Sequence, residues 1–208
     1  MGFLWIASAI LLSYLLGSIP TAYIYVKTIR GIDIREYGSH NVGATNVMRV
    51  VSKKHGLIVL GIDVVKGFLA VRLLSTTAAA GLPAAGAEAW APVLVGLAAI
   101  CGHSWPVWLR FRGGRGVAVS TGVFLALQWQ AVVVALVAFG ILVLATRIVS
   151  LGSLAGAVAL PISVWLFKGG TVLTGFAVAA ALLVIFRHIP NIKRLLRREE
   201  LSFKQNEE

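Results

Sequence analysis

Apolar residues occur in long runs along this chain, and short polar stretches separate the runs. Seven segments are predominantly apolar: residues 3–26, 56–77, 89–103, 116–128, 130–146, 149–167 and 171–186. Several of them are apolar around the whole circumference of a helix, so only lipid or neighbouring helices can cover them. About 20 apolar residues are needed to cross a bilayer as a helix. The pattern predicts an all-α integral membrane protein with about seven transmembrane helices in a single domain, residues 1–208.

Two features of this assignment leave the number of spans open: the third segment and the break after residue 127. The segment 89–103 is short and contains Pro92, and Gln128-Trp129-Gln130 separates two apolar runs. This polar triplet is either a turn between two helices or a polar spot inside one long helix. The first segment lacks the basic leader of a signal peptide and is too long for a signal core, so we interpret it as a retained first span.

The basic residues indicate how the chain is oriented. With seven spans the termini lie on opposite sides, and an outside N-terminus places most cations on one face. That face receives Lys27, Arg30, Arg35, Arg49, Lys53, Lys54, Arg110, Arg112, Arg115, Arg147 and the six basic residues from Arg187 to Lys204. Lys168 is the only loop cation on the other face. By the positive-inside rule the crowded face is cytoplasmic, so the C-terminus and the functional site are expected there.

Composition narrows the possible ligands. A net charge of +11 could suggest nucleic acid, which needs basic residues along one exposed face, but membrane sidedness explains the charge better. The single cysteine, Cys101, excludes an internal disulfide. The four histidines are scattered and acidic residues are few, so we expect neither a metal nor a cofactor.

The first polar stretch reads Gly38-Ser39-His40-Asn41-Val42-Gly43-Ala44-Thr45-Asn46-Val47-Met48-Arg49. Its hydroxyl and amide groups can orient a polyol, its glycines let a ligand approach the backbone, and the guanidinium of Arg49 suits a phosphate. The alternative is an ordinary solvated loop with turn-forming Gly and Asn.

The second polar stretch begins at Gly102-His103-Ser104-Trp105-Pro106 and continues through Phe111-Arg112-Gly113-Gly114-Arg115-Gly116 into an apolar helix. A glycine-rich, cationic turn at a helix N-terminus offers free backbone N–H groups and a positive dipole end, which favours phosphate. The spacing of a Walker motif is absent, so no nucleotide is implied. Alternatively the glycines allow a tight bend and the arginines anchor lipid headgroups.

The third polar stretch runs from Arg187 to Glu200. His188 and Asn191 lie at the membrane boundary, whereas Lys193, Arg197 and Arg198 are typical of a basic helix that binds anionic lipid. Inside the second apolar segment, Asp63 and Lys66 lie three residues apart. Charges there require a partner or a polar cavity, and an ion pair that fixes helix packing is as good an interpretation as catalysis.

Taken in order, these motifs resemble the bacterial acyl-phosphate:glycerol-3-phosphate acyltransferases, the PlsY family. The resemblance extends from Gly17-Ser18-Ile19-Pro20 through Asp63-Val64-Val65-Lys66-Gly67 to Glu200, almost the whole chain. It implies transfer of an acyl group from acyl-phosphate to the 1-hydroxyl of sn-glycerol-3-phosphate, giving lysophosphatidic acid and phosphate. The partners it implies are these substrates and membrane lipid, with no acyl-CoA, acyl carrier protein or obligate protein partner.

The resemblance also implies roles for particular residues. Glycerol-3-phosphate is assigned to Ser39, Asn41, Thr45, Asn46, Arg49, His188 and Asn191. Acyl-phosphate is assigned to His103, Arg112, Gly113, Gly114, Arg115 and Gly116. Catalysis is assigned to Ser39, Arg115, His188 and Asn191. Three positions depart from the family pattern: Arg115 replaces a lysine, Ile189 a basic residue and Arg198 a glycine, and the last leaves open whether Glu199 or Glu200 matches the family glutamate.

Acyl-phosphate has a good leaving group, so orientation and charge stabilisation suffice as the main catalytic devices. The proton of the attacking hydroxyl passes either to His188 or to the acyl-phosphate itself. No histidine is followed five positions later by aspartate, the arrangement of soluble glycerolipid acyltransferases. The main alternative is a transporter of a phosphorylated metabolite, although the polar groups gather on one face only.

Overall fold

The computed structural model describes residues 2–202, and every regular element in that range is helical. The α-helices are α1 Gly2–Ser18, α2 Thr21–Arg30, α3 Ala44–Val50, α4 Lys53–Ala79, α5 Ala87–Ser104, α6 Val117–Thr146, α7 Val149–Leu166, α8 Gly170–Arg187 and α9 Ile189–Leu196. Two short 3-10 helices, Ile34–Glu36 and Val107–Leu109, lie in the polar loops. The prediction of an all-α fold is confirmed.

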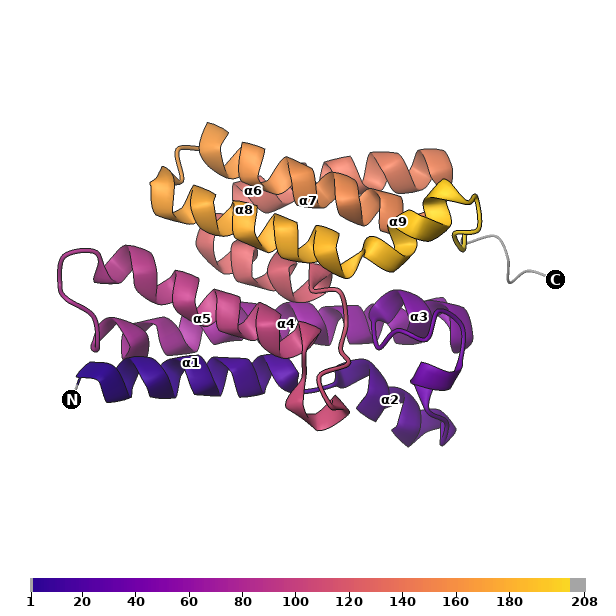
Figure 1. Ribbon diagram of the computed structural model, residues 1–208, viewed down its shortest axis with the longest axis horizontal. Helices are drawn as coiled ribbons and strands as arrows, with labels where there is room; N and C mark the ends of the chain where they lie inside the picture. The colour runs from indigo at the N-terminus through magenta and orange to yellow at the C-terminus, as the bar shows by residue number, and fades with distance from the viewer. Residues whose placement is uncertain (1, 203–208) are drawn as a thin grey trace.

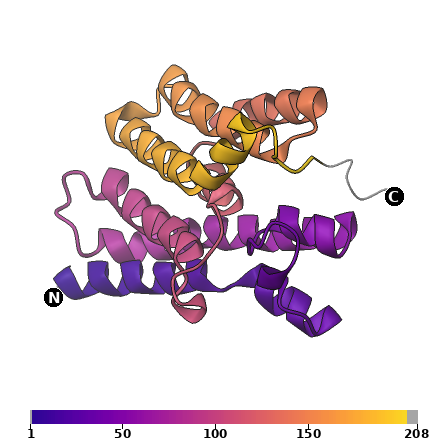
Figure 2. The ribbon, with the colours of Figure 1, turned by 45° about the vertical axis from the view of Figure 1, so that its right-hand side comes forward.

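The long helices form two layers that run along the long axis of the molecule (Figures 1 and 2). One layer contains α1, α4 and α5, and the other contains α7, α8 and part of α6. The layers meet where α6 crosses α4: a Cβ on Gly122 would lie 1.9 Å from the carbonyl oxygen of Val64. Only glycine permits this close approach. Nearby, the rings of Phe124 on α6 and Phe176 on α8 stack with centroids 5.0 Å apart.

Helix α6 consists of two arms. At Gln128 the backbone leaves the helical conformation, with φ −156° and ψ 81°. Side chains from residues 117–124 and from residues 132–139 line the same cavity, so the arms pack side by side and the chain reverses between them. The Nε2 atom of Gln128 donates a hydrogen bond to the carbonyl oxygen of Phe167 at 3.1 Å. Of the two interpretations of this break, the turn is therefore the right one.

The N-terminal segment, predicted as the first span over 3–26, is one candidate span over Gly2–Arg30, but its helix is interrupted. Helix α1 ends at Ser18, and α2 begins at Thr21 and leads away at an angle (Figure 1). Pro20 lies at the junction with φ −85° and ψ 73°. It has no N–H to continue the hydrogen-bond ladder, and its ring disfavours a helical conformation at the preceding residue.

Five helical stretches in residues 2–202 are long and apolar enough to cross a membrane: Gly2–Arg30, Ala87–Leu109, Val117–Thr146, Val149–Leu166 and Gly170–Arg187. This count is lower than the seven predicted from the apolar runs. Helix α4 has 27 residues but contains Asp63, Lys66 and Arg72 in its interior, and both arms of α6 fall within one stretch. Large apolar side chains cover the outside of the bundle, including Leu144 at 83% exposure. Such a surface requires lipid, so the chain is a multi-pass membrane protein.

Candidate active site

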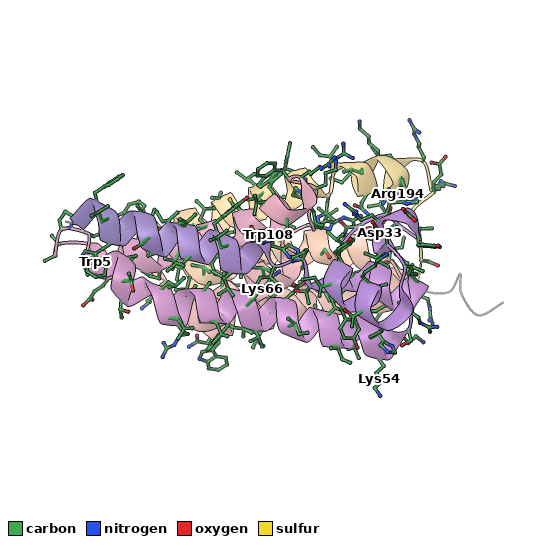
Figure 3. All side chains as sticks on the ribbon, turned by 90° about the horizontal axis from the view of Figure 1, so that it is seen from below. Trp5, Asp33, Lys54, Lys66, Trp108 and Arg194 are labelled. Atoms are coloured by element: carbon green, nitrogen blue, oxygen red, sulfur yellow. The ribbon has the colours of Figure 1, made fainter. Side chains whose placement is uncertain are left out.

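The three polar stretches meet at one end of the helical bundle. They line a cavity of about 410 Å³, whose walls are Ser39, His40, Asn41, Arg115, Phe186, Arg187, Ile189, Pro190 and Arg194. Figure 3 shows Arg194, Asp33 and Lys54 gathered at this end and Trp5 at the other. Segments more than 140 residues apart in the sequence, such as those containing Ser39 and Arg187, thus share one site.

Asn46 fixes the loop of the first polar stretch. Its Oδ1 atom accepts a hydrogen bond from the N–H of Ser39 at 2.8 Å. Its Nδ2 atom donates to the carbonyl oxygens of Ile34 and Tyr37 at 3.2 and 3.0 Å. These contacts use both amide hydrogens, so Asn46 positions Ser39, while Ser39 and Asn41 face the cavity.

Thr45 and Arg49, also predicted to bind glycerol-3-phosphate, are not among the residues that line this cavity. The Nη2 atom of Arg49 donates a hydrogen bond to the carbonyl oxygen of Leu201 at 2.9 Å. Burial lowers the pKa of Arg49, and the negative charge of Glu200 partly offsets this effect. Arg49 therefore lies at the edge of the site, where the C-terminal segment folds back.

The glycine-rich turn is held from two sides. From within the bundle, the carbonyl oxygen of His103 accepts a hydrogen bond from the N–H of Gly114 at 3.0 Å. From the other side, Arg187 donates from Nη2 to the carbonyl oxygen of Gly113 at 2.9 Å and from Nε to that of Gly114 at 3.1 Å. Gly116, with φ 85°, then adopts the left-handed conformation that starts α6. The free N–H groups of the first turn of α6 follow directly.

Arg115 is the candidate ligand for an anion. Its side chain lines the cavity and makes no hydrogen bond or salt bridge to any of residues 2–202. Burial lowers the pKa of Arg115 to about 10, and the charge of Glu200 opposes this shift. Three nearby guanidinium groups lower the pKa further: Arg194, Arg49 and Arg187. This concentration of guanidinium groups around one cavity favours a doubly charged phosphate.

Two other residues predicted to bind acyl-phosphate lie elsewhere. Arg112 is exposed and lines a neighbouring cavity of about 520 Å³ whose walls include Asp33 and Glu36. His103 is 8% exposed and lies beneath the turn, so that a Cβ on Gly114 would come 2.1 Å from its Nε2 atom. His103 therefore supports the turn, and Arg112 faces a different space from Arg115.

His188 is buried, with 1% of its surface exposed, at the junction of α8 and α9. Its Nδ1 atom lies 2.7 Å from the carbonyl oxygen of Val184. Because a carbonyl oxygen only accepts, Nδ1 carries the proton and Nε2 is left as an acceptor. Burial lowers the pKa of His188 from 6.5 to about 4. The hydrogen bond to the carbonyl oxygen of Val184 opposes this shift, and the positive charge of Arg115 adds to it. The imidazole is thus neutral at pH 7.

Asn191 and Glu200 close the site on the α9 side. The carboxylate of Glu200 accepts hydrogen bonds from Nδ2 of Asn191, from Oγ of Ser150 at 2.8 Å and from Nε of Arg194 at 2.7 Å. Burial alone would raise the pKa of Glu200, but these hydrogen bonds outweigh it and the pKa is lowered. The Oδ1 atom of Asn191 is buried without a partner in the described part of the chain, and Asn191 is not among the residues that line the 410 Å³ cavity.

Sequence reasoning missed two arginines that line the cavity, Arg187 and Arg194. Both occur in a basic juxtamembrane stretch and look like lipid-facing cations. One signal was available for Arg194: it follows Asn191 by three residues, a spacing that places both on the same face of a helix. Nothing in the sequence indicates that Arg187 reaches the turn at Gly113.

The fold and the site together define a class: a multi-pass membrane protein with an arginine-lined cavity at one end of the bundle. Comparison with known proteins identifies the family. The sequence model described as "Glycerol-3-phosphate acyltransferase" matches residues 7–198. The chain belongs to this family, and the resemblance to PlsY drawn from its motifs is confirmed.

Individual relatives agree. A glycerol-3-phosphate acyltransferase of Prochlorococcus marinus (strain MIT 9312) is 42% identical over 200 residues, covering 95% of this chain and 98% of the relative. One from Nostoc sp. (strain PCC 7120) is 45% identical over 208 residues, covering 94% and 92%. The crystal structure of PlsY in its glycerol 3-phosphate form superposes with a TM-score of 0.86 at 31% identity over 95% of both chains, and its lysophosphatidic acid form with 0.84.

Proposed function

We propose that the protein is an enzyme of bacterial phospholipid synthesis that transfers a fatty acyl group from acyl-phosphate to the 1-hydroxyl of sn-glycerol-3-phosphate. The products are lysophosphatidic acid and inorganic phosphate. Arg115 carries the proposal: a half-buried guanidinium without a partner in residues 2–202 faces a cavity at the end of an apolar bundle. Both substrates present a phosphate to such a group, and the acyl chain requires the adjoining lipid.

Seven spans are proposed, with the N-terminus outside and the site at the cytoplasmic face of a bacterial inner membrane. To the five candidate spans we add two: the two arms of α6 are counted as separate spans, and α4 is counted as a span. Two of the charges inside α4 form a pair, because Nζ of Lys66 lies 2.8 Å from Oδ1 of Asp63, which lowers the cost of burying them. The basic residues of the cavity end then face the cytoplasm, as the positive-inside rule requires.

The cavity is divided between the two substrates. The phosphate of acyl-phosphate is placed at Arg115, against the N–H groups at the start of α6. Gly113 and Gly114 let the turn pack closely on His103 and Pro106. Glycerol-3-phosphate is placed at Ser39 and Asn41, which line the cavity, with Asn191, Thr45 and Arg49 behind them. Arg187 and Arg194 add positive charge between the two sites.

A second, small cavity of about 60 Å³ begins at Val117, two residues after Arg115, and continues to Phe124 between the arms of α6, α7 and α8. Its walls are mostly apolar, and the first carbons of the acyl chain are placed against it, with the rest of the chain in the adjoining lipid. With the phosphate on Arg115, the carbonyl carbon of acyl-phosphate then lies between the small apolar cavity and the larger polar cavity. This arrangement holds the reacting ends of both substrates together.

In the reaction, the 1-hydroxyl oxygen of glycerol-3-phosphate attacks the carbonyl carbon, forming the ester bond. The bond between that carbon and the bridging oxygen of the phosphate breaks, and phosphate leaves with the hydroxyl proton. His188, with a pKa of about 4, is a weak proton acceptor. This favours transfer of the proton to a phosphate oxygen of the substrate, with Arg115 stabilising the developing negative charge.

The purified protein in detergent, supplied with palmitoyl-phosphate and glycerol-3-phosphate, tests this function. Lysophosphatidic acid and phosphate should appear in equal amounts, and palmitoyl-CoA should not replace palmitoyl-phosphate. Absence of both products from folded protein would refute the proposal. Uptake of glycerol-3-phosphate into vesicles containing the protein, without any product, would instead favour a transporter.

A further inference from the structure

A buried charged cluster lies inside the bundle, and the reaction described above does not use it. Asp63 and Lys66 on α4 are 1% and 5% exposed. Lys66 donates a hydrogen bond from Nζ to the carbonyl oxygen of Ile19 at 2.9 Å, where the chain is broken between α1 and α2. Figure 3 shows Lys66 in the middle of the molecule, between the end marked by Trp5 and the end marked by Arg194.

The aspartate is held from several directions. Its Oδ1 atom accepts a hydrogen bond from Oγ1 of Thr21 at 2.8 Å and forms the ion pair with Lys66. The same oxygen lies 3.9 Å from Nδ1 of His103, so the two side chains are neighbours, although the distance is longer than a hydrogen bond. Replacing a buried ion pair by apolar residues of similar volume is often neutral or stabilising, so stability alone is a weak reason for this cluster.

His103 connects the cluster to the glycine-rich turn. Its ring lies between Asp63 and the turn: Nδ1 is near the Asp63 carboxylate, and Nε2 would lie 2.1 Å from a Cβ on Gly114. Its carbonyl oxygen also accepts the N–H of Gly114 at 3.0 Å. Any movement of His103 must therefore displace Gly114, and with it the direction of the next side chain, Arg115.

We propose that Asp63 and Lys66 are positioning residues. They hold His103 in place between α4 and the glycine-rich turn, and His103 in turn determines the backbone conformation of the turn and the direction of the Arg115 side chain. Arg187 holds the turn through its own hydrogen bonds to the carbonyl oxygens of Gly113 and Gly114, so loss of the pair weakens only the support that comes through the His103 side chain. The assignment of acyl-phosphate to this turn rests on the proposed function, whereas the mechanical link from α4 to Gly114 does not.

The test compares the Asp63→Asn/Lys66→Met double variant with Arg72→Met. The double variant removes both charges with little change in volume and leaves no buried charge without a partner. Arg72 is an exposed cation on the same helix and serves as the matched control. Hydrogen–deuterium exchange is followed in a peptide covering residues 106–116, and Michaelis constants for palmitoyl-phosphate and glycerol-3-phosphate are measured.

In the double variant, exchange in residues 106–116 should be faster while α7 and α8 keep their protection. The Michaelis constant for palmitoyl-phosphate should rise roughly tenfold, because small displacements of binding groups have large kinetic effects. That for glycerol-3-phosphate should change less than about twofold. A rise confined to glycerol-3-phosphate, with faster exchange in the turn, would support the positioning role and refute the division of the cavity.

Wild-type exchange in residues 106–116 together with wild-type Michaelis constants would overturn the proposal. Uniformly faster exchange in all helices of the folded double variant would reduce the pair to a structural role and also overturn the proposal. Thr21→Val, which removes one hydrogen bond from Asp63 and keeps both charges, should give a smaller change of the same kind if the double variant does not fold. Exchange decides the positioning role even if wild-type protein forms no lysophosphatidic acid.

Discussion

The Nδ2 atom of Asn191 donates a hydrogen bond to the Oε1 atom of Glu200, nine residues further along the chain. This contact folds the C-terminal segment back onto α9. The same carboxylate binds Ser150 at the start of α7 and Arg194 on α9, so one side chain joins the elements that close the site. Glu199 is exposed. Of the two glutamates that the sequence left open, Glu200 is therefore the one that enters the site.

Glu200→Gln should destabilise the protein. The substitution keeps the shape of the side chain but removes the charge that pairs with Arg194 and balances the surrounding arginines. Loss of a partner for a partly buried cation costs about 1–3 kcal/mol of the free energy of unfolding. Thermal unfolding in detergent measures this loss. Glu199→Gln is the control and should leave the unfolding temperature unchanged; equal effects of the two substitutions would contradict the assignment.

Gly114→Ala should impair activity through the same turn. The added Cβ would lie 2.1 Å from Nε2 of His103, so the turn must shift away from its support. A shift of this size should lower kcat/KM for acyl-phosphate by roughly tenfold or more. Gly140→Ala is the matched control, because nothing lies within 4 Å of a Cβ at that position. Steady-state kinetics of both variants check the prediction, and full activity of Gly114→Ala would refute it.

Much of the fold followed from apolar runs, because lipid demands continuous hydrophobic helices. The break at Pro20 was missed because hydrophobicity alone does not change there, whereas the loss of one N–H ends α1. Convergence of the polar stretches was predictable because inferred sidedness placed them on one face. The position of Arg187 was not predictable, since a cation at a helix end looks the same whether it meets lipid or Gly113.

Arg112 shows a second limit of sequence reasoning. It lies only three positions from Arg115, yet the two side chains line different cavities. Two residues in the left-handed conformation precede it, Arg110 with φ 52° and Phe111 with φ 62°. These conformations turn the chain in a direction that tertiary contacts select. Residue type did not indicate the turn, because arginine and phenylalanine do not favour this conformation.

Stability should depend on pH through His188. Burial lowers its pKa from 6.5 to about 4 in the folded protein, so between these values the unfolded chain binds more protons. The stabilisation from neutral His188 is complete above pH 6.5 and is lost as the pH falls toward 4. The loss is on the order of 3 kcal/mol.

His188→Gln measures this contribution, because glutamine does not titrate. The difference in unfolding temperature between wild type and variant, measured in detergent, should be constant from pH 7 to pH 8. It should then fall steadily below pH 6.5, as the wild type alone loses stability through this residue. A difference that stays constant down to pH 4.5 would show that His188 is not held neutral by burial.

The two substrates should be separable by substitutions at Arg115 and Arg49. Arg115 lines the cavity beside the turn that starts α6. Arg49 on α3 lies at the edge of the site and donates a hydrogen bond to the carbonyl oxygen of Leu201. Removal of a charged phosphate contact costs about 1.5–3 kcal/mol, or roughly ten- to a hundredfold in the affected constant. Arg115→Ala should mainly raise the Michaelis constant for acyl-phosphate, and Arg49→Ala mainly that for glycerol-3-phosphate.

Steady-state kinetics with each substrate varied in turn measure both constants, and thermal unfolding confirms that each variant is folded. Lys193→Ala is the control, because Lys193 is an exposed cation on α9 that does not line the cavity. Turnover can fall as well where a group contacts the transition state, so the informative quantity is which Michaelis constant moves more. The opposite assignment of the two shifts, or wild-type kinetics for Arg115→Ala, would show that the cavity is divided differently while leaving membership of the family intact.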